Sequence, residues 1–347
     1  MERGGRAGAE TGQSRVTYSL IAGRSLSLES ATYREFATRS KLDTLLPVLK
    51  VGIQLPEVER EVRWPELRDI ARAAEQVGFD SVWVGDHLLF RDPGLPPRGP
   101  WEAWSVLAGL AAATERVEVG PLVACASFHN PAILAKKAAT IDEISGGRLI
   151  LGLGAGWNEA EYRAFGFPFD HRVERFEEAF AIVRGLLREG AVDFVGRWHQ
   201  ARECVLLPPP TRQGGPPIMV GTVGPRMLRL AAAHADAWNA WFTWYGNRPE
   251  GVAALREKVD AACRSVGREP ATLQRTVAVL VQVDTGEISR RGGPPERAPP
   301  LRGSPEDVAE QLQAFAAEGI SHVQLVVDPI TVKSVERLGA VLEAVRT

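Results

Sequence analysis

An acid and an imidazole stand side by side at Asp86 and His87, directly after the short apolar run 81–85. A histidine with an ordinary pKa exchanges a proton near neutral pH, so this pair can perform general acid–base chemistry. The structural alternative is that Asp86 caps a turn and His87 packs beside it, as short polar side chains at turns often do. The position after a strand-like run, more than the residue types, favours the chemical role.

A second candidate is the glycine-rich segment GLGAGWNEAEY, residues 152–162. Its alternating glycines allow a tight turn and let a ligand approach the main-chain N–H groups. The G-x-G-x-x-G fingerprint of dinucleotide folds fails, because Trp157 stands five residues after Gly152. The segment therefore predicts either a ligand-binding turn or a strand-to-helix corner without a ligand.

A third candidate is VGTVGPRM, in which Gly221, Thr222, Val223 and Gly224 precede a helix expected to begin near Pro225. A glycine turn and a hydroxyl at a helix N-terminus make an anion site, so a phosphate there is plausible. No G-K-[ST] follows, so the segment is not a Walker loop.

The fourth candidate is LVACASFHNP, residues 122–131. Small residues follow Leu122 and Val123 at Ala124 and Cys125, where they leave room for a flat ring to lie against the backbone. Helix packing could also demand small residues at this place.

Other chemistries find no support in the sequence. The six histidines include no HExxH pair and no other close ligand pair, so we expect no metal site. No GxSxG elbow is present. The three cysteines are far apart in sequence and odd in number, which favours reduced thiols in the cytoplasm over a disulfide framework.

The elements that position these candidates alternate between short β-branched runs and longer amphipathic helices, the pattern of a parallel sheet with helical crossovers. Eight runs are expected to be strands: 50–55, 81–85, 117–123, 149–153, 218–221, 237–240, 276–283 and 322–327. An eightfold repeat of one unit predicts an α/β fold, a single (β/α)8 TIM barrel, with its site at the C-terminal ends of the strands. All four candidates follow such runs.

Composition and length set the remaining limits. The chain has 347 residues, 45% of them hydrophobic, and a formal net charge of −2, which favours a small-molecule partner over nucleic acid or a membrane surface. Residues 1–48 are predicted to be a flexible N-terminal extension and 49–347 the barrel. Two Pro-, Gly- and Arg-rich stretches, 193–217 and 284–304, are expected to be surface excursions over a barrel end.

Read together, these strand ends resemble the luciferase-like monooxygenase family, and particularly its F420-dependent oxidoreductase branch. The resemblance runs from about residue 49 to the C-terminus. Its most specific parts are HNPAILAKKAATIDEISGGRLILGLGAGWNEAEYRAFGFPF, then PPIMVGTVGPRMLRLAAAHADAW and GSPEDVAEQLQAFAAEGISHVQLVVDP. Each is a long ordered block, more specific than a single glycine motif.

The resemblance implies a barrel that binds a flavin or a 5-deazaflavin, usually as a homodimer. It also implies a bulge after the third strand, often with a non-prolyl cis peptide, that supports the central ring. Carried over by position, the resemblance gives each candidate a role. The ring system would be bordered by the bulge residues Leu122, Val123, Ala124 and Cys125 and by the turn residues Ala155, Gly156, Trp157 and Tyr162. The phosphate would be cradled by Gly221, Thr222, Val223 and Gly224, and the catalytic residues facing the reactive ring would be Asp86 and His87.

The function that this resemblance implies is hydride transfer between F420 and a small organic substrate, with His87 handling the accompanying proton. A deazaflavin lacks the ring nitrogen that makes a flavin react with oxygen. One alternative within the same fold is an FMN-dependent monooxygenase supplied by a separate cofactor reductase. Another is a flavin-binding barrel without turnover. The sequence separates these three only by overall likeness.

Overall fold

The computed structural model describes residues 49–285 and 296–347. The extension predicted for residues 1–48 lies outside the described residues, as does part of the excursion predicted for 284–304. The strands are β1 (Lys50–Gln54), β2 (Ser81–Val84), β3 (Glu118–Pro121), β4 (Ala124–Cys125), β5 (Leu151–Gly154), β6 (Ala191–Val195), β7 (Gln200–Val205), β8 (Ile218–Gly221), β9 (Ala237–Ala240), β10 (Gln274–Gln282) and β11 (His322–Asp328). The α-helices are α1 (Trp64–Val77), α2 (Ala103–Ala113), α3 (Pro131–Ile144), α4 (Glu159–Phe165), α5 (Arg172–Glu189), α6 (Pro225–His234), α7 (Pro249–Ser265), α8 (Pro305–Ala317) and α9 (Val332–Arg346).

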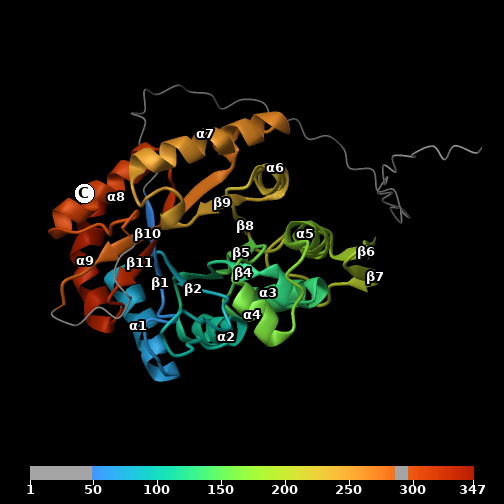
Figure 1. Cartoon of the computed structure of the whole chain (residues 1–347), viewed down its shortest axis with the longest axis horizontal. Coiled ribbons are helices and arrows are strands. Elements are labelled where there is room, and N and C mark those ends of the chain that lie inside the picture. Colours follow the sequence, from blue (N-terminus) through green and yellow to red (C-terminus); the bar gives the residue numbers. More distant parts are fainter. Residues whose placement is uncertain (1–48, 286–295) are drawn as a thin grey trace, which may run out of the picture. The chain divides into compact units, whose positions relative to one another are not determined.

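Nine of these strands form one parallel sheet in the order β3-β2-β1-β11-β10-β9-β8-β5-β4, and the helices lie around it (Figure 1). The two ends of the sheet meet, because a parallel bridge pairs Val119 with Leu149 and the Ile150 N–H donates to the Val119 carbonyl at 2.9 Å. Since β3 and β4 belong to one interrupted strand, the ring contains eight strands. The predicted (β/α)8 barrel is confirmed.

The repeated unit forms for the reasons visible in the sequence. In α1 the buried positions Leu67, Ile70, Ala71 and Ala74 recur at helical spacing and face the sheet. The helix ends at Gly78, whose φ of 104° is left-handed and whose N–H donates to the Ala74 carbonyl. The chain then enters β2, which is buried along its whole length. Such a unit cannot bury its apolar faces alone, so closure of the ring completes the core.

Two expectations about the strands are wrong in detail. The strand predicted over 117–123 ends at Pro121, where β3 stops pairing with β2, and a separate short strand, β4, pairs with β5 from Ala124 onward. The first part of the excursion 193–217 is an antiparallel hairpin, β6–β7, which lies beside α5 (Figure 1). Glu178 of α5 accepts three backbone N–H groups from the hairpin tip, at 2.8 Å each, and so anchors it outside the barrel.

The interior of the barrel is polar near the start of the strands. The Ser81 hydroxyl lies 2.8 Å from Nε2 of His322 and accepts the Trp83 indole N–H at 2.7 Å. Burial lowers the pKa of His322 to about 3, so this imidazole is neutral in the folded protein. Gly52 leaves the space that these side chains fill, because a Cβ there would lie 2.1 Å from the Ser81 hydroxyl.

No helix within the described ranges is long and apolar enough to cross a membrane. Across the same two stretches, 49–285 and 296–347, no group of three His, Cys, Asp or Glu side chains is placed to hold a metal ion.

Candidate active site

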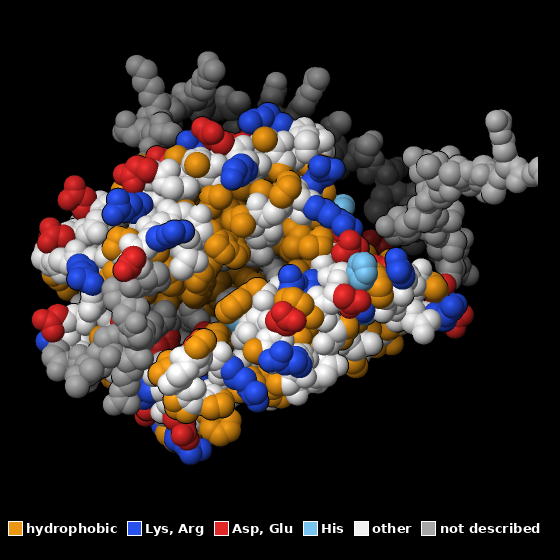
Figure 2. Space-filling model, in the orientation of Figure 1, with side chains coloured by type: hydrophobic (Ala, Val, Ile, Leu, Met, Phe, Trp, Pro, Cys, Tyr) orange, Lys and Arg blue, Asp and Glu red, His pale blue; other side chains and the backbone are white. Residues whose placement is uncertain are grey.

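The candidate residues gather at the C-terminal ends of β2, β4, β5 and β8, on one side of the ring. Figure 2 shows that the face in view is hollowed near its centre and that hydrophobic side chains surround the hollow. The same place in Figure 1 is ringed by strands of the barrel. An apolar hollow with a few polar groups around it is the usual form of a small-molecule site.

His87 is held by a buried carboxylate from another part of the chain. Its Nδ1 lies 2.8 Å from Oε1 of Glu161, in α4, whose side chain is 0% exposed. The second oxygen of Glu161 accepts the Leu88 N–H at 2.7 Å, and Oε1 also accepts an N–H of Asn158 at 2.5 Å. Because a carboxylate can only accept, Nδ1 of His87 carries a proton. This hydrogen bond fixes the proton on Nδ1, so Nε2 is the ring nitrogen available for acid–base chemistry.

Charges around His87 favour its protonated form. Burial lowers the pKa of His87, but its hydrogen bond to Glu161 and the charges of Glu57, Glu161 and Asp86 together raise the pKa above its ordinary value. Oε1 of Glu57 lies 4.0 Å from Nε2. The imidazole therefore lies between two carboxylates, which makes an imidazolium that can donate a proton from Nε2.

Aromatic rings enclose the same imidazole. Phe90 lies 4.7 Å from it between ring centroids, and Trp157 lies edge-on at 5.7 Å. Trp157 is 65% exposed, whereas the His87 side chain is 22% exposed. The indole thus covers His87 and presents a large apolar surface to the solvent.

Asp86 has a different setting from its neighbour. Its Oδ2 accepts the Cys125 N–H at 2.9 Å and lies 3.0 Å from Nε2 of His129. Asp86 is buried, and both contacts go to the segment that follows β3. This geometry gives Asp86 the task of holding that segment in place rather than of meeting a substrate.

The segment between β3 and β4 contains the cis peptide bond expected there, between Leu122 and Val123. The Val123 side chain packs over three glycines of the neighbouring strands. A Cβ added at Gly154 would lie 2.8 Å from Val123, and one at Gly152 or Gly221 would lie 3.0 or 3.1 Å away. These glycines make room for a valine, so their smallness is explained by packing without a ligand.

The turn after β5 is supported by the side chain of Tyr162. Gly156 has a φ of 77°, and a Cβ there would lie 2.0 Å from the Tyr162 hydroxyl. That hydroxyl donates to the Ala155 carbonyl at 2.8 Å and lies 3.2 Å from Sγ of Cys125. Burial raises the pKa of the Cys125 thiol to about 12 and raises that of Tyr162, so both groups stay protonated. The buried Tyr162 supports the turn, and Ala155 and Gly156 form its surface.

The turn after β8 leads into α6 without a side-chain cap. The Thr222 hydroxyl accepts the Gly224 N–H at 3.3 Å, and a Cβ at Gly224 would meet nothing within 4 Å. Gly224 therefore borders open space, and α6 begins at Pro225, which has no N–H. Arg226 is turned toward α5, where it pairs with Glu174 at 3.0 Å and with Glu177. The turn offers backbone donors and one hydroxyl to an anion, with no side-chain cation of its own from Arg226.

Three polar residues of this site were missed by sequence reasoning: Glu161, Glu57 and His129. The signal for Glu161 was present, because GWNEAEY places an acid five residues beyond Gly156, in the first turn of a short helix. Its buried position could not be foreseen, since the neighbouring Glu159 is exposed on the same helix. Glu57 and His129 lie on loops whose directions do not follow from spacing.

Comparison with known families gives a match over residues 48–289 to the family described as luciferase-like monooxygenase. Two relatives illustrate the likeness. One is a 5,10-methylenetetrahydromethanopterin reductase of Archaeoglobus fulgidus, 29% identical over 68% of this chain and 65% of its own length. The other is a phthiodiolone/phenolphthiodiolone dimycocerosates ketoreductase of Mycobacterium tuberculosis, 32% identical over 63% of this chain and 61% of its own length. The chain therefore matches less than two thirds of either relative.

Among solved structures, an F420-dependent secondary alcohol dehydrogenase in complex with an F420-acetone adduct has the same fold. Its TM-score is 0.71 at 21% identity, over 86% of this chain and 99% of that one. At this identity the likeness concerns the fold.

Proposed function

This chain belongs to the luciferase-like monooxygenase family, a family of flavin- and deazaflavin-dependent oxidoreductases, and from that premise we propose that it is an F420-dependent oxidoreductase. It would transfer a hydride between the deazaflavin and a small organic substrate. The observation that carries this proposal is His87, held by the buried Glu161 at the barrel mouth, beside the glycine turns that follow β5 and β8.

The residues present suit such a cofactor. Its phosphate would meet Thr222 and the uncapped N-terminus of α6, where the space beside Gly224 is open. Its ring system would lie near the surface formed by Val123, Ala155 and Gly156. Bound F420 would supply hydride exchange at its C5 carbon.

The chain's own groups would supply position and a proton. Glu161 orients the imidazole of His87 and favours its protonated form, so that Nε2 can donate a proton to a substrate oxygen or take one in the reverse direction. Trp157 and Phe90 keep bulk water from the ring of His87. Asp86 stays on the scaffold and holds the segment that carries Val123.

The names of the relatives favour reduction over oxygenation. Both are described as reductases, and the dehydrogenase of the same fold was solved with an F420 adduct. An FMN-dependent monooxygenase supplied by a separate reductase is the competing function, because FMN offers a phosphate and a planar tricycle as well. A homodimer, which the family resemblance implies, belongs to the proposal too.

Titration of the purified full chain with F420 and with FMN tests the proposal. Quenching of tryptophan fluorescence is a suitable signal because Trp157 stands at the site. We expect saturable quenching by F420 and a weaker response to FMN, and a Trp157→Phe variant should lose part of the F420 signal while still binding by equilibrium dialysis. Binding of FMN alone would overturn the choice of cofactor. Binding of neither would favour a barrel without turnover.

A further inference from the structure

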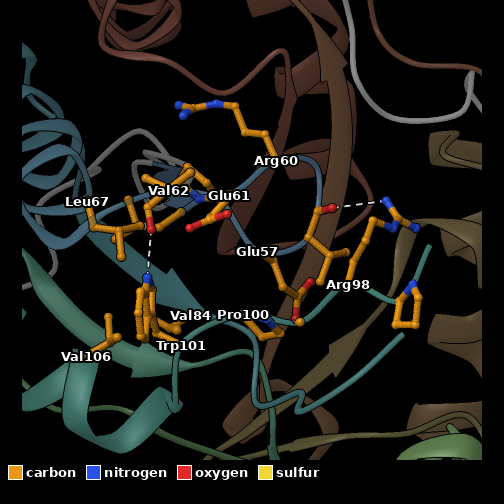
Figure 3. Close-up of a pocket in the computed structure, with 15 residues that line it drawn as sticks. Glu57, Arg60, Glu61, Val62, Leu67, Val84, Arg98, Pro100, Trp101 and Val106 are labelled. Carbon is orange, nitrogen blue, oxygen red and sulfur yellow. Dashed lines mark hydrogen bonds between the residues drawn. The ribbon is translucent and has the colours of Figure 1, made fainter. Parts of the chain in front are cut away.

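A cavity of about 370 Å³ lies beside the barrel mouth, between the loop that follows β1 and residues 97–101. It is separate from the turns assigned to the cofactor. Figure 3 shows that the two ends of this cavity differ. Apolar side chains gather at one end, and Glu57 and Arg98 stand toward the other. The apolar end is formed by Val62, Leu67, Val84, Trp101 and Val106.

Glu57 connects this cavity with His87. It lines the cavity, and its Oε1 lies 4.0 Å from Nε2 of His87. The carboxylate rests directly on Gly85, where an added Cβ would lie 1.9 Å from the same oxygen. One glycine and one carboxylate thus separate the cavity from the imidazole, so a molecule held in the cavity would have its polar end close to the proton donor.

The cations around the cavity are engaged in bracing its loops. Arg60 pairs with Glu66, and Arg98 pairs with Asp92 and donates to the Val58 carbonyl at 3.0 Å. An anionic ligand would therefore find no uncommitted positive charge among these lining groups. An uncharged ligand needs no such partner.

We propose that this cavity binds the organic substrate, and that the substrate is an uncharged, mainly apolar molecule with one hydroxyl or carbonyl group. The apolar body lies among Val84, Trp101 and Val106, and the oxygen lies at the Glu57 end. The volume is near the lower limit of small-molecule pockets, about 300–1,000 Å³, so the substrate is small. This inference rests on the proposed function in one respect, since the substrate must react beside His87.

This site is tested by measuring, with ligand-observed NMR, the binding of cyclohexanone to the full chain with F420 present. Cyclohexanecarboxylate and cyclohexylammonium are the charged probes of the same ring size. We expect cyclohexanone to bind in preference to both. Val58→Trp, which fills the cavity from its partly exposed rim, should weaken cyclohexanone binding by about tenfold or more, equivalent to about 1.4 kcal/mol.

Val195→Trp is the matched control, because it makes the same change on the exposed face of the β6–β7 hairpin and should leave binding unchanged. Trp101→Ala enlarges the cavity and should shift preference from cyclohexanone toward cyclooctanone, which keeps the test sharp if Val58→Trp folds poorly. Unchanged cyclohexanone binding in both cavity variants, or tighter binding of the carboxylate, would overturn the proposal. F420 binding is measured separately by equilibrium dialysis. Cavity-dependent ketone binding without F420 binding would overturn the proposed function and leave the binding site standing.

Discussion

Replacing Glu161 by glutamine tests the central relation of the site, the dependence of His87 on one buried carboxylate. The two oxygens of Glu161 accept hydrogen bonds from His87, Leu88 and Asn158. A carboxamide has nearly the same shape, but only one of its two terminal atoms accepts hydrogen bonds. At least one of these donors would therefore face an NH2 group and lose its partner.

The cost follows from that geometry. A buried donor left without an acceptor costs about 1–3 kcal/mol, and loss of the charge beside the imidazole adds to it, so we expect a total of about 2–4 kcal/mol. For a domain of this size the corresponding fall in Tm is about 3–6 °C. Because Glu161 raises the pKa of His87, its contribution to stability is full below the unfolded pKa of about 6.5 and is lost as pH rises through the folded pKa. The difference between the two proteins should be larger at acidic pH.

The direct assay is NMR titration of the histidine ring protons in the full chain, with the His87 signal assigned from its absence in a His87→Asn variant. We expect the pKa of His87 to be lower in Glu161→Gln than in the original protein. Glu159→Gln is the control, because it makes the same change on the same helix at an exposed position. An unchanged His87 pKa in Glu161→Gln, or an equal shift in Glu159→Gln, would refute the reasoning.

Three further predictions follow from the same geometry. His87→Asn should lower turnover at least about a hundredfold, the usual contribution of a positioned acid or base, while F420 affinity measured by fluorescence stays within about twofold. Gly156→Ala should destabilise the fold in urea denaturation, because φ is 77° and the new Cβ would collide with Tyr162, whereas Gly224→Ala should be tolerated. The pKa of His322 is lowered from 6.5 to about 3 in the folded protein. Because the unfolded chain therefore binds a proton at a higher pH than the folded chain does, stability should fall as pH drops from about 6.5 toward 3. His322→Gln should flatten that decline between pH 7 and 4.5, and parallel declines in both proteins would contradict the assignment.

The barrel could be predicted because its signals are local and repeated. Several helices, among them α1, α4 and α5, end at a glycine, and the barrel strands are apolar runs, so the runs 218–221 and 237–240 coincide with β8 and β9 to the residue. The end of β3 at Pro121 and the separate strand β4 beyond residue 123 could not be predicted from the apolar run 117–123, because they depend on which neighbour each segment pairs with. The β6–β7 hairpin was missed because its stability comes from Glu178, which lies on α5 and not in the hairpin.

The candidate residues lie at neighbouring strand ends, and their roles stay predictions. The expectation that Asp86 and His87 act together rested on their adjacency in the chain. In the structure Asp86 is committed to the Cys125 N–H, and the carboxylate that serves His87 comes from residue 161. Long-range pairing of this kind leaves no trace in spacing. The glycines also carry a second meaning that composition could not reveal, since Gly152 and Gly154 accommodate a valine from the segment between β3 and β4.

Those glycines have a consequence for the evolution of this barrel. Gly152, Gly154 and Gly221 come from two strands and share one neighbour, Val123, so a change at any of them alters the cost of a change at the others. Free energies of substitution at these four positions should not add. Mutational paths through them are narrow, and a library that varies them one at a time would sample mostly damaged proteins. Variation for new substrates is better directed to the loops around the cavity, where each side chain can change independently of this group.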